Sequence, residues 1–99
     1  MDQQEIEKQL QVLNSKINNK WLLSNDRITK AFKFRDFNEA LNFMVRVGRH
    51  AEDLDHHPEW CNVYDIVSIE LTTHSAGGIT ELDFSLASRI EDEFILASP

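Results

Sequence analysis

Three of the four histidines in the chain, His56, His57 and His74, are expected at the ends of helices and strands, where a rigid scaffold presents functional groups to a pocket. Histidine has an unperturbed pKa of about 6.5, so its ring both gives and takes protons near neutral pH. His56 and His57 are adjacent and precede Pro58, and His74 follows further along the chain. The surrounding carboxylates could orient an imidazole or fix its tautomer; they are Glu52, Asp55 and Asp83. The pattern indicates general acid–base catalysis.

Each of these residues also has a purely structural interpretation. His56 and His57 could form a solvated helix end that is favoured by the helix macrodipole, and His74 could be a polar strand end. Trp60 could stack on a planar ligand or belong to the core. Asp83 occupies the fourth position of a capping box, where it could serve only a backbone N–H. The residue pattern leaves both interpretations open.

Other kinds of site fit the sequence less well. The cysteine and histidine spacings lack the CxxC and HExxH patterns of zinc sites, so no metal is expected. No G-x-S-x-G motif carries a nucleophilic serine, and Gly77-Gly78 lacks the lysine of a phosphate loop. Cys61 is expected to be an inert buried thiol. His50 is expected on the surface of a helix, away from the other histidines.

Length and composition bound the possible functions. The 99 residues predict one domain over residues 1–99, and 41% hydrophobic with 27% charged residues is a globular composition. A net charge of −7 disfavours binding to nucleic acid. A single cysteine cannot form an internal disulfide, and no signal peptide or long apolar run is visible. These features predict a soluble, cytoplasmic protein.

The first half of the chain predicts a helix followed by a hairpin. Apolar residues at helical spacing predict a helix over about residues 2–18, with Asp2 as its N-cap. Residues 21–23 and 28–34 then predict two strands around a turn at residues 24–27. Ile28, Lys30, Phe32 and Phe34 share one face of the second strand, where Lys30 interrupts the apolar pattern.

The second half predicts two more helices and an intervening strand. A capping box at Asp36 opens a helix that should end near Asp55, because Pro58 disfavours helical geometry just before it. The β-branched segment from Val63 to Thr73 predicts a long strand, so that one strand or more than one lies between these helices, and residues 76–78 predict a turn. A second capping box at residues 80–83 opens a third helix. Short loops and this order predict an α+β two-layer sandwich, with an antiparallel sheet and the helices on one face.

Residues 51–64 resemble the central motif of the pterin-4a-carbinolamine dehydratase family. The motif comprises Glu52, Asp55-His56-His57-Pro58-Glu59-Trp60 and Tyr64, and the resemblance continues through Thr73-His74, Gly78-Ile79-Thr80 and Asp83. It covers about residues 21–90. The resemblance implies a four-stranded antiparallel sheet with three helices on one face.

The resemblance also implies an activity, which is the elimination of water from 4a-hydroxytetrahydropterin during tetrahydrobiopterin recycling. The product is the quinonoid dihydropterin, and neither a metal nor a bound cofactor is required. By resemblance, His57 is the main proton-transfer group, while His56 and His74 contact the pterin and handle the hydroxyl. The residues that hold the pterin or orient the histidines would be Glu52, Asp55, Trp60 and Asp83. Leu82 departs from the pattern, since many relatives carry arginine there.

The implied partners are the pterin substrate and further copies of the chain. Relatives form homodimers through sheet edges and, in many cases, homotetramers through helices. Some animal members also bind a dimeric transcription factor, so a protein-binding module is the main alternative to an enzyme. A relative diverted to molybdopterin metabolism is another. Nothing in this sequence points specifically to a transcription-factor partner, to nucleic acid or to a membrane.

Overall fold

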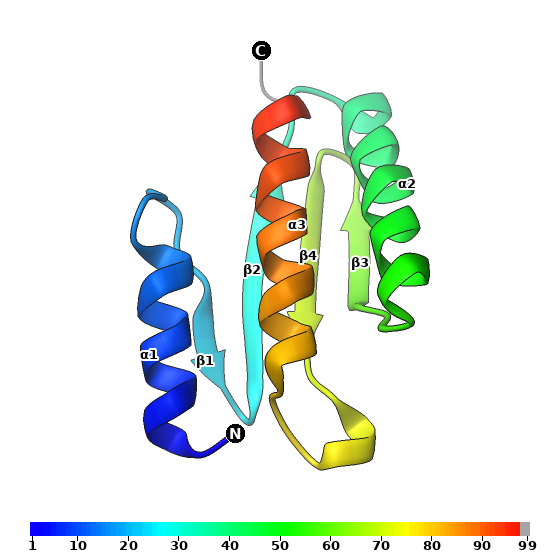
Figure 1. Cartoon of the computed structure of the whole chain (residues 1–99). Helices are drawn as coiled ribbons and strands as arrows, with labels where there is room; N and C mark the ends of the chain where they lie inside the picture. The colour runs from blue at the N-terminus through cyan, green and yellow to red at the C-terminus, as the bar shows by residue number, and fades with distance from the viewer. Residues whose placement is uncertain (98–99) are drawn as a thin grey trace.

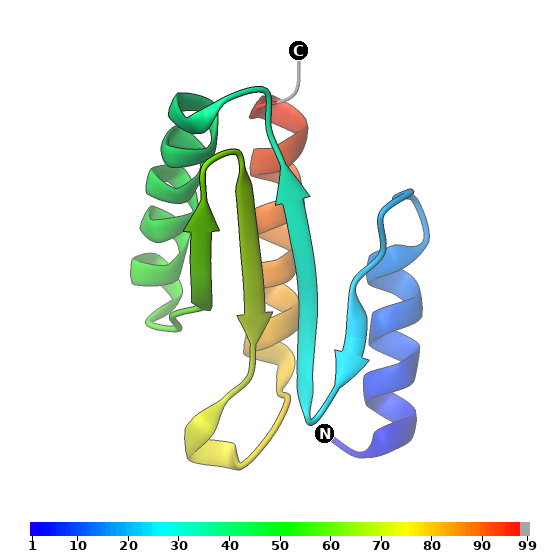
Figure 2. The same ribbon diagram turned by 180° about the vertical axis from the view of Figure 1, so that it is seen from behind.

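The computed structural model describes residues 1–97 and contains a four-stranded antiparallel sheet covered on one face by three helices (Figure 1). Viewed from behind, the other face of the sheet is open (Figure 2). The elements are α1 (Gln3–Asn14), β1 (Leu22–Ser24), β2 (Arg27–Lys33), α2 (Phe37–Leu54), β3 (Glu59–Val63), β4 (Ile66–Leu71), a 3-10 turn (His74–Ala76) and α3 (Glu81–Ala97). The predicted α+β sandwich is therefore confirmed.

Helix α1 begins as predicted but ends earlier than residue 18. The Asp2 side chain caps it by accepting a hydrogen bond from the N–H of Glu5 at 2.8 Å. At the other end, the Asn14 side chain bonds both the N–H and the C=O of Trp21, at 2.9 and 3.0 Å. Lys20 Nζ donates to the carbonyls of Asn14 and Ile17. These contacts turn the chain back toward the sheet and end the helix.

The strands run in the order β1-β2-β4-β3. The predicted hairpin between β1 and β2 is present, and its turn residues Asn25 and Asp26 have φ of 52° and 59°. Asparagine and aspartate tolerate this left-handed backbone better than most residues, which is why they favour such turns. Ile28, Lys30 and Phe32 face the helices as expected.

Of the one or more strands expected between α2 and α3, the chain forms two, the hairpin β3–β4, and no single strand runs from Val63 to Thr73. Tyr64 adopts φ of 52°, and the Asn62 side chain donates to the carbonyls of Tyr64 and Ile66 at 3.0 and 2.9 Å. Val63 therefore stands 70% exposed at a strand end instead of continuing the buried row of Val67. The hairpin also places Glu59 directly opposite Glu70.

The core between the layers is rich in aromatic rings. Phe34 and Phe43 have ring centroids 4.8 Å apart, and those of Phe32 and Phe94 are 5.0 Å apart. Helix α2 contributes Phe43 and spans the predicted range, because Asp36 caps its start by accepting from the N–H of Glu39. This layer fixes α2 and α3 against the sheet.

Lys30 lies in this core because it is paired. Its Nζ is 2.6 Å from Glu91 Oε2 on α3, and Trp21 Nε1 donates to the same oxygen at 2.9 Å. The ammonium also lies 4.7 Å from the centroid of the Phe32 ring. A buried charge with such partners explains the polar residue within an apolar face.

Candidate active site

Three histidine–carboxylate pairs lie at the end of the sheet where β3 begins and β4 ends. Because Glu59 is opposite Glu70, the chain enters β3 and leaves β4 at the same end. Figure 1 shows the α2–β3 connection and the 3-10 turn together at that end. His56 and His57 lie just before β3, and His74 begins the 3-10 turn after β4. The fold thus gathers the three predicted histidines from two separate segments.

The pair of His56 and Asp83 is buried. Their Nε2 and Oδ1 atoms are 2.5 Å apart, and the Asp83 side chain is fully buried. The other oxygen, Oδ2, accepts from Thr73 Oγ1 and from the N–H of Thr80, each at 2.9 Å. Because a carboxylate only accepts, we assign the His56 proton to Nε2, which leaves Nδ1 as the acceptor. Asp83 therefore both caps α3 and orients His56, so the structural and the functional interpretation of this residue both apply.

The second pair joins His57 to the last turn of α2. His57 Nε2 lies 2.9 Å from Glu52 Oε1, and the His57 side chain is 56% exposed. Asp55 ends the helix in the left-handed conformation, with φ of 49°, and its N–H bonds the carbonyls of Ala51 and Glu52. This cap reverses the chain, so that the ring of His57 reaches back to Glu52.

The third pair joins His74 to Glu59, which the sequence did not single out as a site residue. His74 Nε2 lies 2.7 Å from Glu59 Oε1, and Arg27 of β2 donates to Glu59 Oε2. The hydrogen bond from Arg27, followed by that from His74, holds the pKa of the Glu59 carboxyl below its usual value. Only the β3–β4 hairpin reveals this contact, because the two residues are 15 positions apart and no local pattern links them.

The other predicted residues have different surroundings. Trp60 is half-buried and pairs with the buried Ile69, so it packs against the core on the helix side of β3. Asp55 acts through its backbone, as described. Leu82, in the first turn of α3, is 39% exposed. Cys61 is exposed, contrary to expectation, because it lies on the open face of the edge strand β3.

His50 lies apart from the three pairs, as expected. It is half-buried between α2 and α3, where its Nε2 is 2.7 Å from Glu93 Oε2. Arg46 donates to the other oxygen of the same carboxylate at 3.0 Å. His50 therefore belongs to an ion-pair network that joins two helices.

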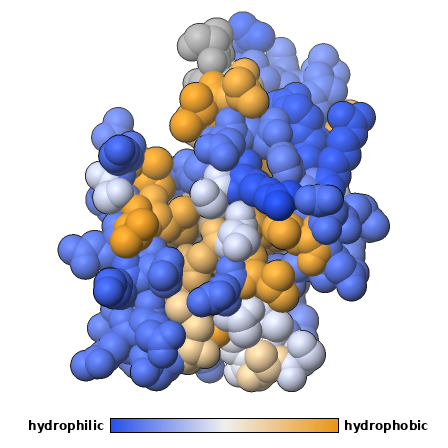
Figure 3. All heavy atoms as spheres, in the orientation of Figure 1, coloured by the Kyte–Doolittle hydropathy of each residue, from blue (hydrophilic) through white to orange (hydrophobic). Residues whose placement is uncertain are grey.

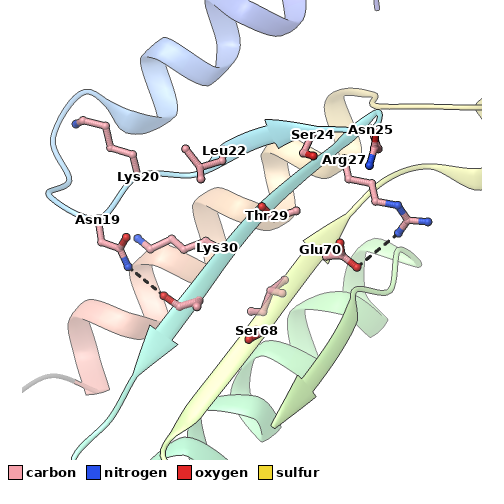
Figure 4. Close-up of a pocket in the computed structure, with 12 residues that line it drawn as sticks. Asn19, Lys20, Leu22, Ser24, Asn25, Arg27, Thr29, Lys30, Ser68 and Glu70 are labelled. Atoms are coloured by element: carbon pink, nitrogen blue, oxygen red, sulfur yellow. Dashed lines mark hydrogen bonds and ion pairs between the residues drawn. The ribbon is translucent and has the colours of Figure 1, made fainter. Parts of the chain in front are cut away.

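Two hollows lie away from the histidines. A pocket of about 640 Å³ lies on the open face of the sheet, where residues of β1, β2 and β4 line it (Figure 4). A groove of about 390 Å³ runs between α1 and α3. Figure 3 shows apolar side chains on this helix-covered side, and Val12 and Ile95 in the groove are 63% and 64% exposed. None of the three histidines lines either hollow.

In residues 1–97, no cluster of three or more histidine, cysteine, aspartate or glutamate side chains is arranged to hold a metal ion. The α-helices within residues 1–97 are all too short or too polar to span a lipid bilayer.

Comparisons with known proteins agree on one family. The sequence model described as "Pterin 4 alpha carbinolamine dehydratase" matches residues 1–93. A Chelativorans protein that carries this enzyme's name provisionally is 48% identical over 92 residues, covering 91% of this chain and 89% of its own. A similarly named Paraburkholderia xenovorans protein is 58% identical over 66 residues, covering 67% and 69%.

Two solved structures are similar to this one. The crystal structure of a transcriptional coactivator/pterin dehydratase from Brucella melitensis has a TM-score of 0.85 at 38% identity, covering 94% of this chain and 96% of that one. A pterin dehydratase-like protein, identified as a RuBisCO assembly factor in the alpha-carboxysome, has a TM-score of 0.64 at 18% identity, covering 80% and 92%. At that identity the second likeness concerns the fold alone.

Proposed function

Because the chain belongs to the pterin 4 alpha carbinolamine dehydratase family, we propose that it eliminates water from a 4a-hydroxytetrahydropterin to give the quinonoid dihydropterin. The observation that supports this activity is the pairing of three histidines with carboxylates at one end of the sheet. An elimination needs one group to give a proton and another to take one, and oriented imidazoles serve both purposes.

The chemistry requires no change of oxidation state. The bond between the ring carbon and the hydroxyl breaks as a proton reaches the departing oxygen. A ring nitrogen loses its proton, and the electron pair of that N–H bond forms the new C=N bond. Water is the only leaving group. General acid–base assistance of this kind contributes about 10²–10⁴-fold in rate.

In this proposal His57 is the main proton-transfer group. Its ring is exposed enough to meet a substrate, and Glu52 Oε1, 2.9 Å from Nε2, orients it. His56 and His74 contact the pterin and handle the hydroxyl. Asp83 fixes the tautomer of His56, so that its Nδ1 remains available as an acceptor.

The remaining proposed residues act on the shape of the site. Asp55 ends α2 and so sets where His57 points, and Trp60 supports β3 from the helix side. Leu82 presents an apolar side chain beside Asp83, where many relatives carry arginine. At this position the protein therefore has no positive charge with which to bind the substrate.

The test is an assay of dehydration. A hydroxylase generates the 4a-hydroxytetrahydropterin, and its decay is followed with and without this protein. We expect the wild type to accelerate decay and His57→Ala to lower the rate by about 10²-fold or more. His50→Ala is the control, since His50 contacts Glu93 and lies apart from the three pairs. Equal rates for both folded variants would refute the role of His57.

A protein-binding role is the second candidate, because the Brucella melitensis relative is named both a coactivator and a dehydratase. The two roles differ in their dependence on the histidines. A surface that binds a transcription regulator would keep its affinity in His57→Ala, whereas dehydration would be lost. We also propose that the protein acts in tetrahydrobiopterin recycling. In that pathway a pterin-dependent hydroxylase supplies the 4a-hydroxytetrahydropterin.

A further inference from the structure

Glu59 of β3 contacts the 3-10 turn and strand β2 through its two carboxylate oxygens. Oε1 accepts from His74 Nε2 at 2.7 Å, and Oε2 accepts from Arg27. Arg27 belongs to β2, which is separated from β3 by β4. Both oxygens of one carboxylate are therefore held, one by the candidate site and one by a strand outside it.

The Arg27 side chain crosses the open face of the sheet to make this contact. Figure 4 shows it pointing from β2 toward Glu70 of β4, and its Nη1 lies 4.0 Å from Glu70 Oε2. Glu70 is directly opposite Glu59 in the sheet register, so both glutamates are on the same face. Arg27 reaches past one glutamate and donates to the other.

His74 depends on this contact more than the other histidines depend on theirs. Its side chain is 73% exposed, against 9% for His56. It lies on a 3-10 turn outside the sheet, and within residues 1–97 its side chain makes a hydrogen bond to Glu59 alone. An exposed side chain on a short turn samples several rotamers unless a partner holds it.

We propose that Glu59 is a positioning residue for His74, and that Arg27 in turn fixes the Glu59 carboxylate. A carboxylate only accepts, so Glu59 places the His74 proton on Nε2 and leaves Nδ1 free to work on the substrate. The catalytic consequence rests on the proposed dehydratase function and names a further residue of that site. The hydrogen bond from Arg27 is also the main reason that the pKa of the Glu59 carboxyl is lowered.

A merely structural role for Glu59 predicts something different. A surface ion pair that spans three strands would affect unfolding and leave the tautomer of a histidine unchanged. The two roles are therefore separated by measuring the imidazole itself. Two-dimensional NMR of ¹⁵N-labelled imidazoles distinguishes Nε2–H from Nδ1–H in the neutral ring.

The experiment compares variants on the two facing glutamates. Glu59→Leu removes the acceptor, and Glu59→Gln restores an uncharged oxygen in the same place. Glu70→Leu is the matched control, since Glu70 lies opposite Glu59 and near Arg27 but belongs to the adjacent strand. Each variant is read by the His74 tautomer, by kcat and KM for dehydration, and by the pH profile of kcat.

In Glu59→Leu we expect a mixture of the two His74 tautomers, an altered pH profile and a kcat lowered about tenfold, part of the general acid–base contribution. We expect Glu59→Gln to recover part of both and Glu70→Leu to match the wild type. A wild-type tautomer and kcat in folded Glu59→Leu would overturn the inference.

If Glu59→Leu does not fold, Glu59→Ser gives the same reading, because its hydroxyl is too short to reach His74. A wild type without dehydratase activity would refute the proposed function, while the tautomer would still decide the role of Glu59.

Discussion

Replacing Lys30 by methionine should destabilise the protein, although it places an apolar residue in an apolar layer. The Lys30 side chain is 2% exposed, and its ammonium is 2.6 Å from Glu91 Oε2. Without it, the Glu91 carboxylate stays buried, at 9% exposure, with Trp21 Nε1 as its remaining donor. Removing one partner of a buried ion pair destabilises a protein more than replacing both partners by apolar residues.

The expected loss is large for a chain of this size. Removing one member of a buried ion pair typically costs about 3–5 kcal/mol, against about 5–15 kcal/mol for the whole free energy of unfolding. Since 1 kcal/mol shifts the Tm of a domain this small by about 4–8 °C, the Tm of Lys30→Met should fall by at least about 12 °C.

The assay is equilibrium unfolding in urea, with a double variant and a matched control. Lys30→Met combined with Glu91→Gln removes both charges and keeps an acceptor for Trp21, so it should lie within about 1 kcal/mol of the wild type. Lys33→Met removes an exposed lysine whose ion pair to Asp65 spans 3.4 Å, and it should cost no more than about 1 kcal/mol. The reasoning is refuted if Lys30→Met costs as little as Lys33→Met.

Three further outcomes are expected. Asp83→Asn keeps an acceptor for the two threonines but turns an amide N–H toward His56, so steady-state kinetics should show dehydration lowered at least about tenfold; an unchanged rate would contradict the role of this carboxylate. The pKa of Glu93 is held below its ordinary 4.5 mainly by the hydrogen bond from His50; burial opposes this shift, and the charge of His50 and the Arg46 contact add to it. Because the pKa is lower in the folded state, the Glu93 carboxylate adds to stability above pH 4.5, and this contribution is lost as the pH falls through the folded-state pKa. The free energy of unfolding in urea, measured between about pH 5 and 3, should therefore depend less on pH in Glu93→Gln than in the wild type. Equal pH dependences in the two proteins would exclude this contribution. Finally, β3 is an edge strand that ends in the exposed Val63, and we expect light scattering to show at least a dimer; the 11.5 kDa mass of one chain would disprove it.

Short-range chemistry in the sequence determined the boundaries of α2 and the first hairpin. Asp36 caps α2 through the N–H three residues on, and Asp55 ends it in a left-handed conformation. Asn25 and Asp26 form the turn that their backbone preferences favour. The three histidines were expected at the ends of helices and strands, and that is where they lie. Each of these features depends on residues a few positions apart, and such interactions are visible in a linear pattern.

The pairing of charged groups was decided by the tertiary structure alone. Tyr64 adopts a left-handed backbone that few residues of its type adopt, so the sequence indicated a long strand after Val63 and did not reveal the turn. That hairpin is what brings Glu59 to His74, and the packing of α3 on the sheet is what brings Glu91 to Lys30. These partners are separated by 15 and 61 positions in the chain. Their meeting depends on the register of strands and on how helices settle into a shared core, and neither is encoded within a single local segment.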